Sequence, residues 1–251
     1  MDGFTDRHLI LTLAWYNAMP RLMKYLLIGS ASVLCLGIAG LLVLSVSSRA
    51  AVQRAVDLAT DPLAPRAGFE LMQIPSFAGK TQEDKPVSET IFDGRVTVLS
   101  FIFTHCPLAC PAMTSTVKGV ADELKADSVR FVTISLDPGN DTPARLKEWG
   151  ENYKADFARW TFINAGPGVH KHILRDVFQE HLELDPSFQI PLDGDKTMDN
   201  IVHPTVIYLI GPDRKVIDRF ASKRAEEVSS LVQRARMAAT SLGSKPAKPL
   251  R

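Results

Sequence analysis

Hydrophobic and polar residues divide the chain into an apolar N-terminal stretch and a longer segment of mixed pattern. The run YLLIGSASVLCLGIAGLLVLSV, residues 25–46, contains no charged residue and is rich in leucine, isoleucine and valine. As a helix it would reach ~33 Å, which is enough to cross the hydrocarbon layer of a membrane. We therefore predict one transmembrane helix at 25–46, preceded by a short N-terminal segment, residues 1–24. A cleaved signal peptide is the alternative, although its apolar region is typically only about 7–15 residues long.

The rest of the chain alternates apolar strands with amphipathic helices. We expect residues 47–66 to form a polar, proline-containing tether, residues 67–243 a soluble domain, and residues 244–251 a flexible basic tail. Within the domain, RVTVLSFIF (95–103) and SVRFVTISL (128–136) are nearly continuously apolar. This pattern is expected of parallel strands that are covered on both faces of a sheet.

The spacing of apolar residues also predicts the helices. Met113, Val117 and Val120 recur on one face of a helix, and Thr142 followed by Pro143 is typical of a helix start. We expect a strand at WTFIN and then a helix around Val169 to Val177. PTVIYLI and KVIDRF should form a hairpin, and a last helix should lie around Val228 to Ala235. This order is thioredoxin-like, and it predicts an α/β sandwich with a central mixed sheet.

The charge balance of the chain bears on the class of its partners. The chain is 45% hydrophobic and 23% charged, with a formal net charge of +1. This near-neutral balance gives no reason to propose nucleic acid as a partner.

Two of the three cysteines stand four residues apart in THCPLACP, as Cys106 and Cys110, each followed by proline. They come at the carboxyl end of a buried strand, where a helix begins and where ligands collect in open α/β sheets. The partial positive charge of a helix N-terminus favours thiolate over thiol. We expect Cys106 on the loop and Cys110 at the helix start, with converging sulfurs. That arrangement allows a disulfide and equally two thiolates on one metal.

A third ligand has to come from elsewhere in the chain, and His203 is the best candidate. It immediately precedes a predicted strand, after the long polar segment DPSFQIPLDGDKTMDN, which we expect to be a loop. Two thiolates with one imidazole suit copper, especially in its reduced form.

The pieces FTHCPLACP, ISLDPGNDTPARL and HPTVIYLIGPDRKV, with Tyr208 shortly after His203, resemble the Sco/SenC family of membrane-anchored copper chaperones. The resemblance implies Cu(I) or Cu(II) bound by Cys106, Cys110 and His203. It further implies delivery of copper to, or assembly of, the copper centre on a subunit of a haem–copper (cytochrome c) oxidase. It implies a single-pass protein of the inner (cytoplasmic) membrane, with the soluble domain on the periplasmic side.

The chain departs from the family pattern at two places. Many relatives have an acidic residue between the cysteines, where this chain has Leu108 and Ala109, and the usual D-H-[ST] is Val202-His203-Pro204. Pro204 before an apolar strand also resembles the proline that packs beside the redox cysteines of thioredoxins. The alternative function is therefore a membrane-tethered thiol–disulfide oxidoreductase that keeps a client's copper-ligand cysteines reduced. In it Cys106 would attack and Cys110 would resolve the mixed disulfide.

Other polar and sulfur side chains are expected to have structural roles. We expect His105 to pack or hydrogen-bond, Met113 to lie in the core, and Asp137, Asp141 and Thr142 to form a turn and a helix cap. The histidines 170, 172 and 181 are expected to be solvated, and Asp193, Asp195 and Asp199 lack the spacing of a calcium loop.

Overall fold

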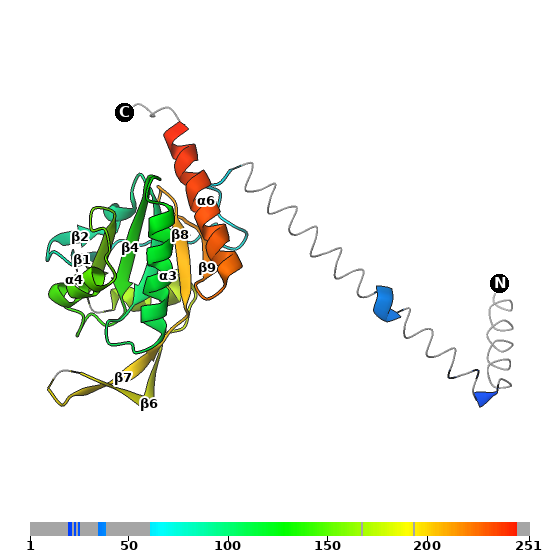
Figure 1. The fold of residues 1–251 in the computed structure, drawn as a ribbon, viewed down its shortest axis with the longest axis horizontal. Coiled ribbons are helices and arrows are strands. Elements are labelled where there is room, and N and C mark those ends of the chain that lie inside the picture. The colour runs from blue at the N-terminus through cyan, green and yellow to red at the C-terminus, as the bar shows by residue number, and fades with distance from the viewer. Residues whose placement is uncertain are drawn as a thin grey trace, which may run out of the picture. The chain divides into compact units, whose positions relative to one another are not determined.

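A seven-stranded mixed sheet forms the centre of the domain, in the order β2-β1-β5-β4-β3-β8-β9 (Figure 1). The computed structural model describes residues 61–166, 168–192 and 194–244, and in the N-terminal region Pro20, Arg21, Met23, Tyr25 and Cys35–Ile38. Strands β3, β4 and β5 are parallel, and β8 lies antiparallel to β3. The predicted α/β architecture with a central mixed sheet is confirmed.

Strands and helices alternate through the middle of the domain. The strands are β1 (Ala78–Thr81), β2 (Pro86–Ser88), β3 (Val96–Ile102), β4 (Val129–Ser135), β5 (Trp160–Asn164), β6 (Glu183–Pro191), β7 (Thr197–Val202), β8 (Val206–Ile210) and β9 (Val216–Ala221). The helices are η1 (Glu89–Phe92), α3 (Ala109–Glu123), α4 (Pro143–Asn152), α5 (Val169–His172), the π-helical turn η2 (Ile173–Val177) and α6 (Ala225–Ser244).

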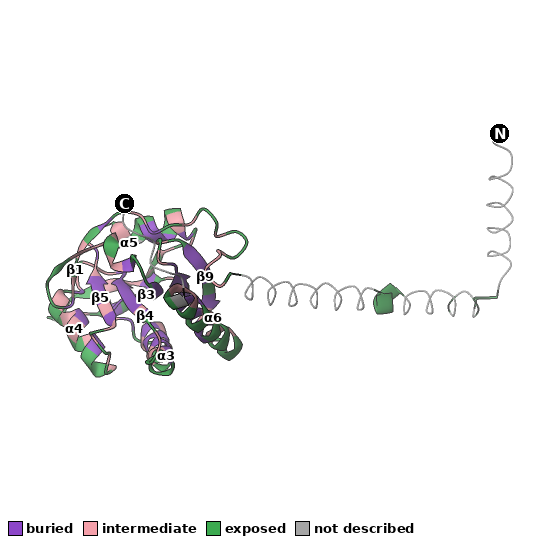
Figure 2. Ribbon diagram, turned by 90° about the horizontal axis from the view of Figure 1, so that it is seen from above, coloured by how far each residue is buried: buried purple, intermediate pink, exposed green. Residues whose placement is uncertain are grey.

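Burial explains why β3 occupies the middle of the sheet. All seven of its residues are buried, as the continuous apolar run predicts for a strand covered on both faces. Helices α3 and α6 contact each other and β3 on one side, and their exposed faces point outward (Figure 2). On β3 and β8, the rings of Phe101 and Tyr208 meet Phe178, which stacks on Tyr208 with ring centroids 3.9 Å apart.

One predicted loop is wrong. Most of the polar segment between Asp185 and Asn200 belongs to β6 and β7, which pair with each other as a separate two-stranded sheet. This hairpin projects away from the central sheet (Figure 1). Its register is shifted between Asp185 and Gln189, and most of its residues are exposed or half-buried. Because so few of its residues are buried, the segment lacks the alternation of apolar and polar residues that identifies a half-buried strand.

The predicted N-terminal segment, transmembrane helix and C-terminal tail lie almost entirely outside the described residues, as does most of the tether. Among the residues that are described, no helix combines the length and apolar character needed to cross a membrane.

Candidate metal centre

The loop between β3 and α3 places Cys106 at the N-terminus of a helix. Cys110 is the second residue of α3, and its backbone N–H donates to the Cys106 Sγ at 3.4 Å. The helix has no side-chain cap of the usual oxygen type at Leu108, so a sulfur takes up a free amide there. Cys106 is 8% exposed and Cys110 is 0% exposed, and both are free thiols. The predicted placement on the loop and at the helix start is confirmed.

The two thiols have opposite acidities. A hydrogen bond from the Cys110 side chain, together with the backbone amides of residues 108–110, lowers the pKa of Cys106 to about 5 against the opposing effect of burial. Burial, together with the neighbouring Cys106 sulfur, raises the pKa of Cys110. At neutral pH the metal-free protein therefore holds a thiolate at Cys106 and a protonated thiol at Cys110.

His203 comes from the far side of the sequence and reaches the sulfurs. Its Nε2 lies 3.6 Å from the Cys110 Sγ, and its Nδ1 lies 3.0 Å from the carbonyl oxygen of Pro204. Because a carbonyl oxygen only accepts, Nδ1 carries the ring proton and Nε2 directs its lone pair at Cys110. Burial lowers the pKa of His203, which favours this neutral form. The ring also packs edge-on against Phe103, with centroids 6.1 Å apart.

The structure thus brings together the three residues that the sequence singled out. Cys110 is the shared member, in contact with Cys106 through its backbone and side chain and with His203 through its sulfur. The peptide bond before Pro204 is trans, as are all the peptide bonds of the described residues.

Asp141 supports the loop that holds Cys106, and sequence reasoning assigned it only to a turn. Its side chain is buried, with 0% exposure. It accepts hydrogen bonds from the Thr104 backbone, from Thr104 Oγ1 at 2.5 Å and from Ser135 Oγ at 2.6 Å. Burial raises the pKa of Asp141, and these hydrogen bonds oppose that effect. Arg145 Nε also donates to Thr104 Oγ1, at 3.0 Å. One feature of the sequence could have indicated this role: Asp141 follows a second buried strand, β4, which ends at the same edge of the sheet as β3.

The neighbouring polar residues agree with most of the structural roles expected of them. Asp137 accepts hydrogen bonds from the backbone and side chain of Asn140, which makes it the turn residue predicted. Thr142 caps α4 by accepting from the Arg145 backbone, also as predicted. His105 Nδ1 is buried without a hydrogen-bond partner among the described residues, so packing rather than hydrogen bonding describes this side chain.

The remaining candidates lie in the core or on the surface. Met113 is 1% exposed and belongs to the core, as predicted. His172 is exposed and pairs with Asp176, and His181 is exposed. The side chain of His170 and the whole of Asp193 lie outside the described residues. Asp199 accepts from Gln189 across the hairpin.

Fold and site together define a class of protein. It is an α/β domain with a central mixed sheet, in which two neighbouring cysteines at a helix start meet a histidine that precedes an antiparallel strand. A family model described as SCO1/SenC matches residues 69–238. The chain therefore belongs to the SCO1/SenC family.

Individual relatives agree with this assignment. The SCO1 protein homolog of Bacillus subtilis is 31% identical over 147 residues, which cover 58% of this chain and 72% of that protein. The chain spans less than half the length of three further curated relatives.

Solved structures have the same fold. BsSco is described as a member of the Sco family of cytochrome c oxidase assembly proteins with a disulfide switch. It is 28% identical, has a TM-score of 0.55, and the match covers 67% of this chain and 94% of BsSco. ScoI of Bradyrhizobium japonicum, solved with copper bound, has a TM-score of 0.51 at 24% identity, with 64% of this chain and 98% of that chain covered.

Proposed function

We propose that this chain is a copper metallochaperone that binds copper through Cys106, Cys110 and His203. It delivers that copper to, or helps to assemble, the copper centre of a haem–copper oxidase. The single observation that carries the proposal is the 3.6 Å contact between His203 Nε2 and Cys110 Sγ, next to the Cys106 sulfur. The copper-bound relative and the description of BsSco as an oxidase assembly protein support this choice of cargo and client.

The donor set fits copper as cargo. Thiolates are soft ligands that suit Cu(I), and imidazole nitrogen suits copper in both oxidation states. Cys106 is a thiolate at neutral pH and His203 presents a lone pair, so two of the three donors need no deprotonation. Cys110 has to lose its proton when it binds metal, because its pKa is raised. Copper binding therefore releases a proton, and we expect the affinity to increase with pH.

The membrane location is part of the same proposal. The uncharged run at residues 25–46 would anchor the chain in the inner membrane as a single span, with the soluble domain on the periplasmic side. Protease accessibility of the domain in intact spheroplasts, compared with lysed ones, tests this orientation.

Copper titration of a histidine variant tests the ligand set. The full chain, reduced and in detergent, is titrated with Cu(I) and Cu(II) in competition with a chelator. The wild type is expected to bind one copper per chain, and His203→Ala to lower the Cu(II) affinity by at least ~10-fold, because it removes a direct ligand. The matched control is His181→Ala, since His181 is exposed and lies outside the proposed ligand set. Normal copper binding by His203→Ala would refute the ligand set.

The asymmetric thiols favour a second candidate function, thiol–disulfide exchange. The Cys106 thiolate attacks a client disulfide, and one client sulfur leaves as a thiolate that takes up a proton. Cys110 then loses its proton to His203 Nε2, which lies 3.6 Å away, and attacks the Cys106 sulfur of the mixed disulfide. The second client sulfur leaves as a thiolate and takes up that proton. The client ends as a dithiol and this chain as a disulfide. Reductase activity that depends on both cysteines, with copper binding unaffected by His203→Ala, would favour this function over the first.

A further inference from the structure

The surface around the proposed copper ligands is apolar and acidic. Under the proposed function, on which this inference rests, a protein that exchanges copper with this site must bring its own ligand to the metal. Metal–ligand bonds are about 2.0–2.3 Å long. Such a partner therefore has to contact the residues next to Cys106, Cys110 and His203.

Two of those neighbouring residues are exposed and apolar. Leu108 lies between the cysteines and is 78% exposed, and Val202 directly precedes His203 and is 47% exposed. We call these two residues the apolar rim. Single exposed aliphatic side chains are common on protein surfaces. These two, however, come from two separate elements, the start of α3 and the end of β7, and both adjoin the copper ligands in sequence. The apolar rim therefore places apolar surface where a protein that exchanges copper with this site has to make contact.

The hairpin β6–β7 adds charge next to the rim. It ends at Val202, projects from the domain (Figure 1), and contains five acidic residues and one lysine between positions 183 and 199. Within the described part of the chain none of Glu183, Asp185, Asp195 and Asp199 forms an ion pair. The hairpin also exposes Leu184 and Phe188, at 57% and 47%. The charges of these four carboxylates are therefore not neutralised by a basic side chain of the described residues.

We propose that the apolar rim and the acidic hairpin together form the docking surface for the protein that exchanges copper with this site. That partner presents apolar contact residues surrounded by lysine and arginine. Apolar centres with polar edges are typical of protein–protein interfaces, and unpaired charge of one sign steers an oppositely charged partner. A membrane surface fits less well, because the hairpin repels the anionic lipids that attract basic segments.

Two sets of variants in the full chain separate the rim from the hairpin. Leu108→Ala with Val202→Thr removes apolar surface and adds no charge, and alanine brings no side-chain oxygen that would compete with the Cys106 sulfur for the amides of the helix N-terminus. Glu183→Lys with Asp195→Asn changes the hairpin charge by three units. Asparagine tolerates the positive φ of 57° at position 195. The control is Leu71→Ser, because Leu71 is 98% exposed and adjoins no copper ligand.

The probe is the copper-free oxidase subunit that carries the copper centre, from the same organism. The rate of copper transfer to it is followed by absorbance at several salt concentrations. We expect the rim variant to slow transfer about 10-fold at every salt concentration. We expect the hairpin variant to slow it about 10-fold at low salt and to lose most of the salt dependence. Leu71→Ser should transfer copper at the wild-type rate.

Chelator competition on each variant distinguishes failure of this inference from failure of the proposed function. Wild-type copper affinity with slowed transfer supports the docking surface. Wild-type transfer rates in both variants overturn it, even where the copper site itself is intact. Phosphatidylglycerol vesicles are a second probe of the same variants. If the protein binds these vesicles and both variants lose that binding, the docking surface is overturned as well. Absence of copper binding by the wild type refutes the proposed function instead.

Discussion

At the scale of single residues, the two cysteines differ through their surroundings. The sequence was sufficient to place Cys106 on a loop and Cys110 at a helix start, because Pro111 and the preceding apolar strand fix the boundary. In the structure Cys106 is the more exposed of the two thiols, at 8% against 0%. The direction of each pKa shift depends on which amides point at which sulfur, and spacing alone does not show that.

Alkylation of the metal-free protein tests the acidity of Cys106. In a Cys35→Ser background, at neutral pH, we expect iodoacetamide to modify Cys106 and to leave Cys110 unmodified. The rate should fall as the pH falls through about 5, because the thiolate takes up a proton there. Cys110→Ala removes the hydrogen bond that contributes most to this shift, so the midpoint should move to higher pH. Peptide mass spectrometry across a pH series measures both. A Cys106 midpoint near 8.5, the ordinary value for cysteine, would contradict the assignment.

Asp141 shows what residue-level reasoning from the sequence misses. The sequence suggests a turn, since ISLDPGNDTP is rich in turn-forming residues and Thr142 caps the helix that follows. The side chain instead joins Thr104, Ser135 and the loop of Cys106, all brought together by the parallel pairing of β3 and β4. Contacts of this kind depend on strand order, which local patterns do not encode.

At the scale of elements, strongly patterned segments were predictable and weakly patterned ones were not. β3 and β4 differ from their predicted ranges by only one residue at each end. The hairpin β6–β7 was missed because it includes Pro186 and Pro191 and few buried residues. The short strands β1 and β2 carried no signal either, because their four and three residues are half-buried or exposed.

Two helical glycines provide a test of packing at this scale. Gly119 on α3 is exposed, and a Cβ there would meet nothing within 4 Å. Gly119→Ala should therefore stabilise the domain by ~0.5–1 kcal/mol through helix propensity. A Cβ at Gly150 on α4 would lie 2.5 Å from a Phe157 carbon and 2.9 Å from a Phe162 carbon. Gly150→Ala should therefore destabilise the domain by ~1–3 kcal/mol through overpacking.

Urea unfolding followed by tryptophan fluorescence measures both changes, and each variant is the control of the other. Free energies of unfolding that change in the same direction would contradict the packing described for α4.

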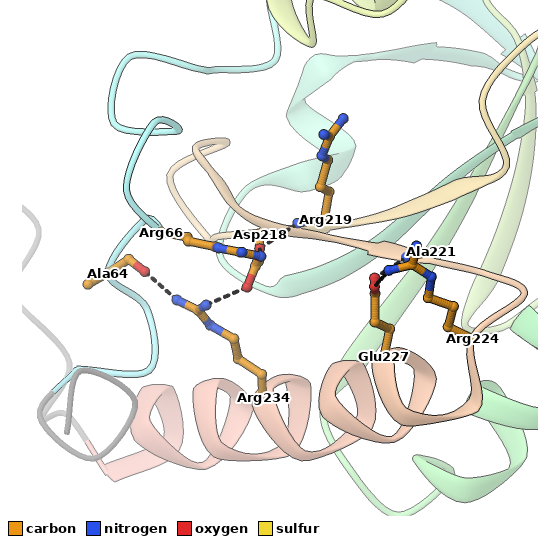
Figure 3. Close-up of polar contacts among 8 residues, drawn as sticks. All are labelled: Ala64, Arg66, Asp218, Arg219, Ala221, Arg224, Glu227 and Arg234. Atoms are coloured by element: carbon orange, nitrogen blue, oxygen red, sulfur yellow. Dashed lines mark hydrogen bonds and ion pairs between the residues drawn. The ribbon is translucent and has the colours of Figure 1, made fainter. Parts of the chain in front are cut away.

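At the scale of the whole domain, the order of the strands and the long-range ion pairs could not be predicted. Asp218 on β9 joins segments that are far apart in sequence (Figure 3). One carboxylate oxygen pairs with Arg66 at 3.2 Å and the other with Arg234 of α6 at 2.7 Å. Arg234 also donates to the Ala64 carbonyl oxygen at 2.6 Å. The last residues of the predicted tether are thereby fixed to β9 and α6.

Removing Asp218 tests this connection. Its side chain is 7% exposed and that of Arg234 is 12% exposed, so Asp218→Ala removes the carboxylate from an ion pair that is largely shielded from water. We expect a loss of ~3–5 kcal/mol in the free energy of unfolding and faster trypsin cleavage after Arg66. Lys80→Ala is the control, because it breaks an exposed pair with Asp84 and should cost less than ~1 kcal/mol. Unchanged cleavage after Arg66 in Asp218→Ala would show that Asp218 does not hold this segment, and its stability cost would then belong to β9 and α6 alone.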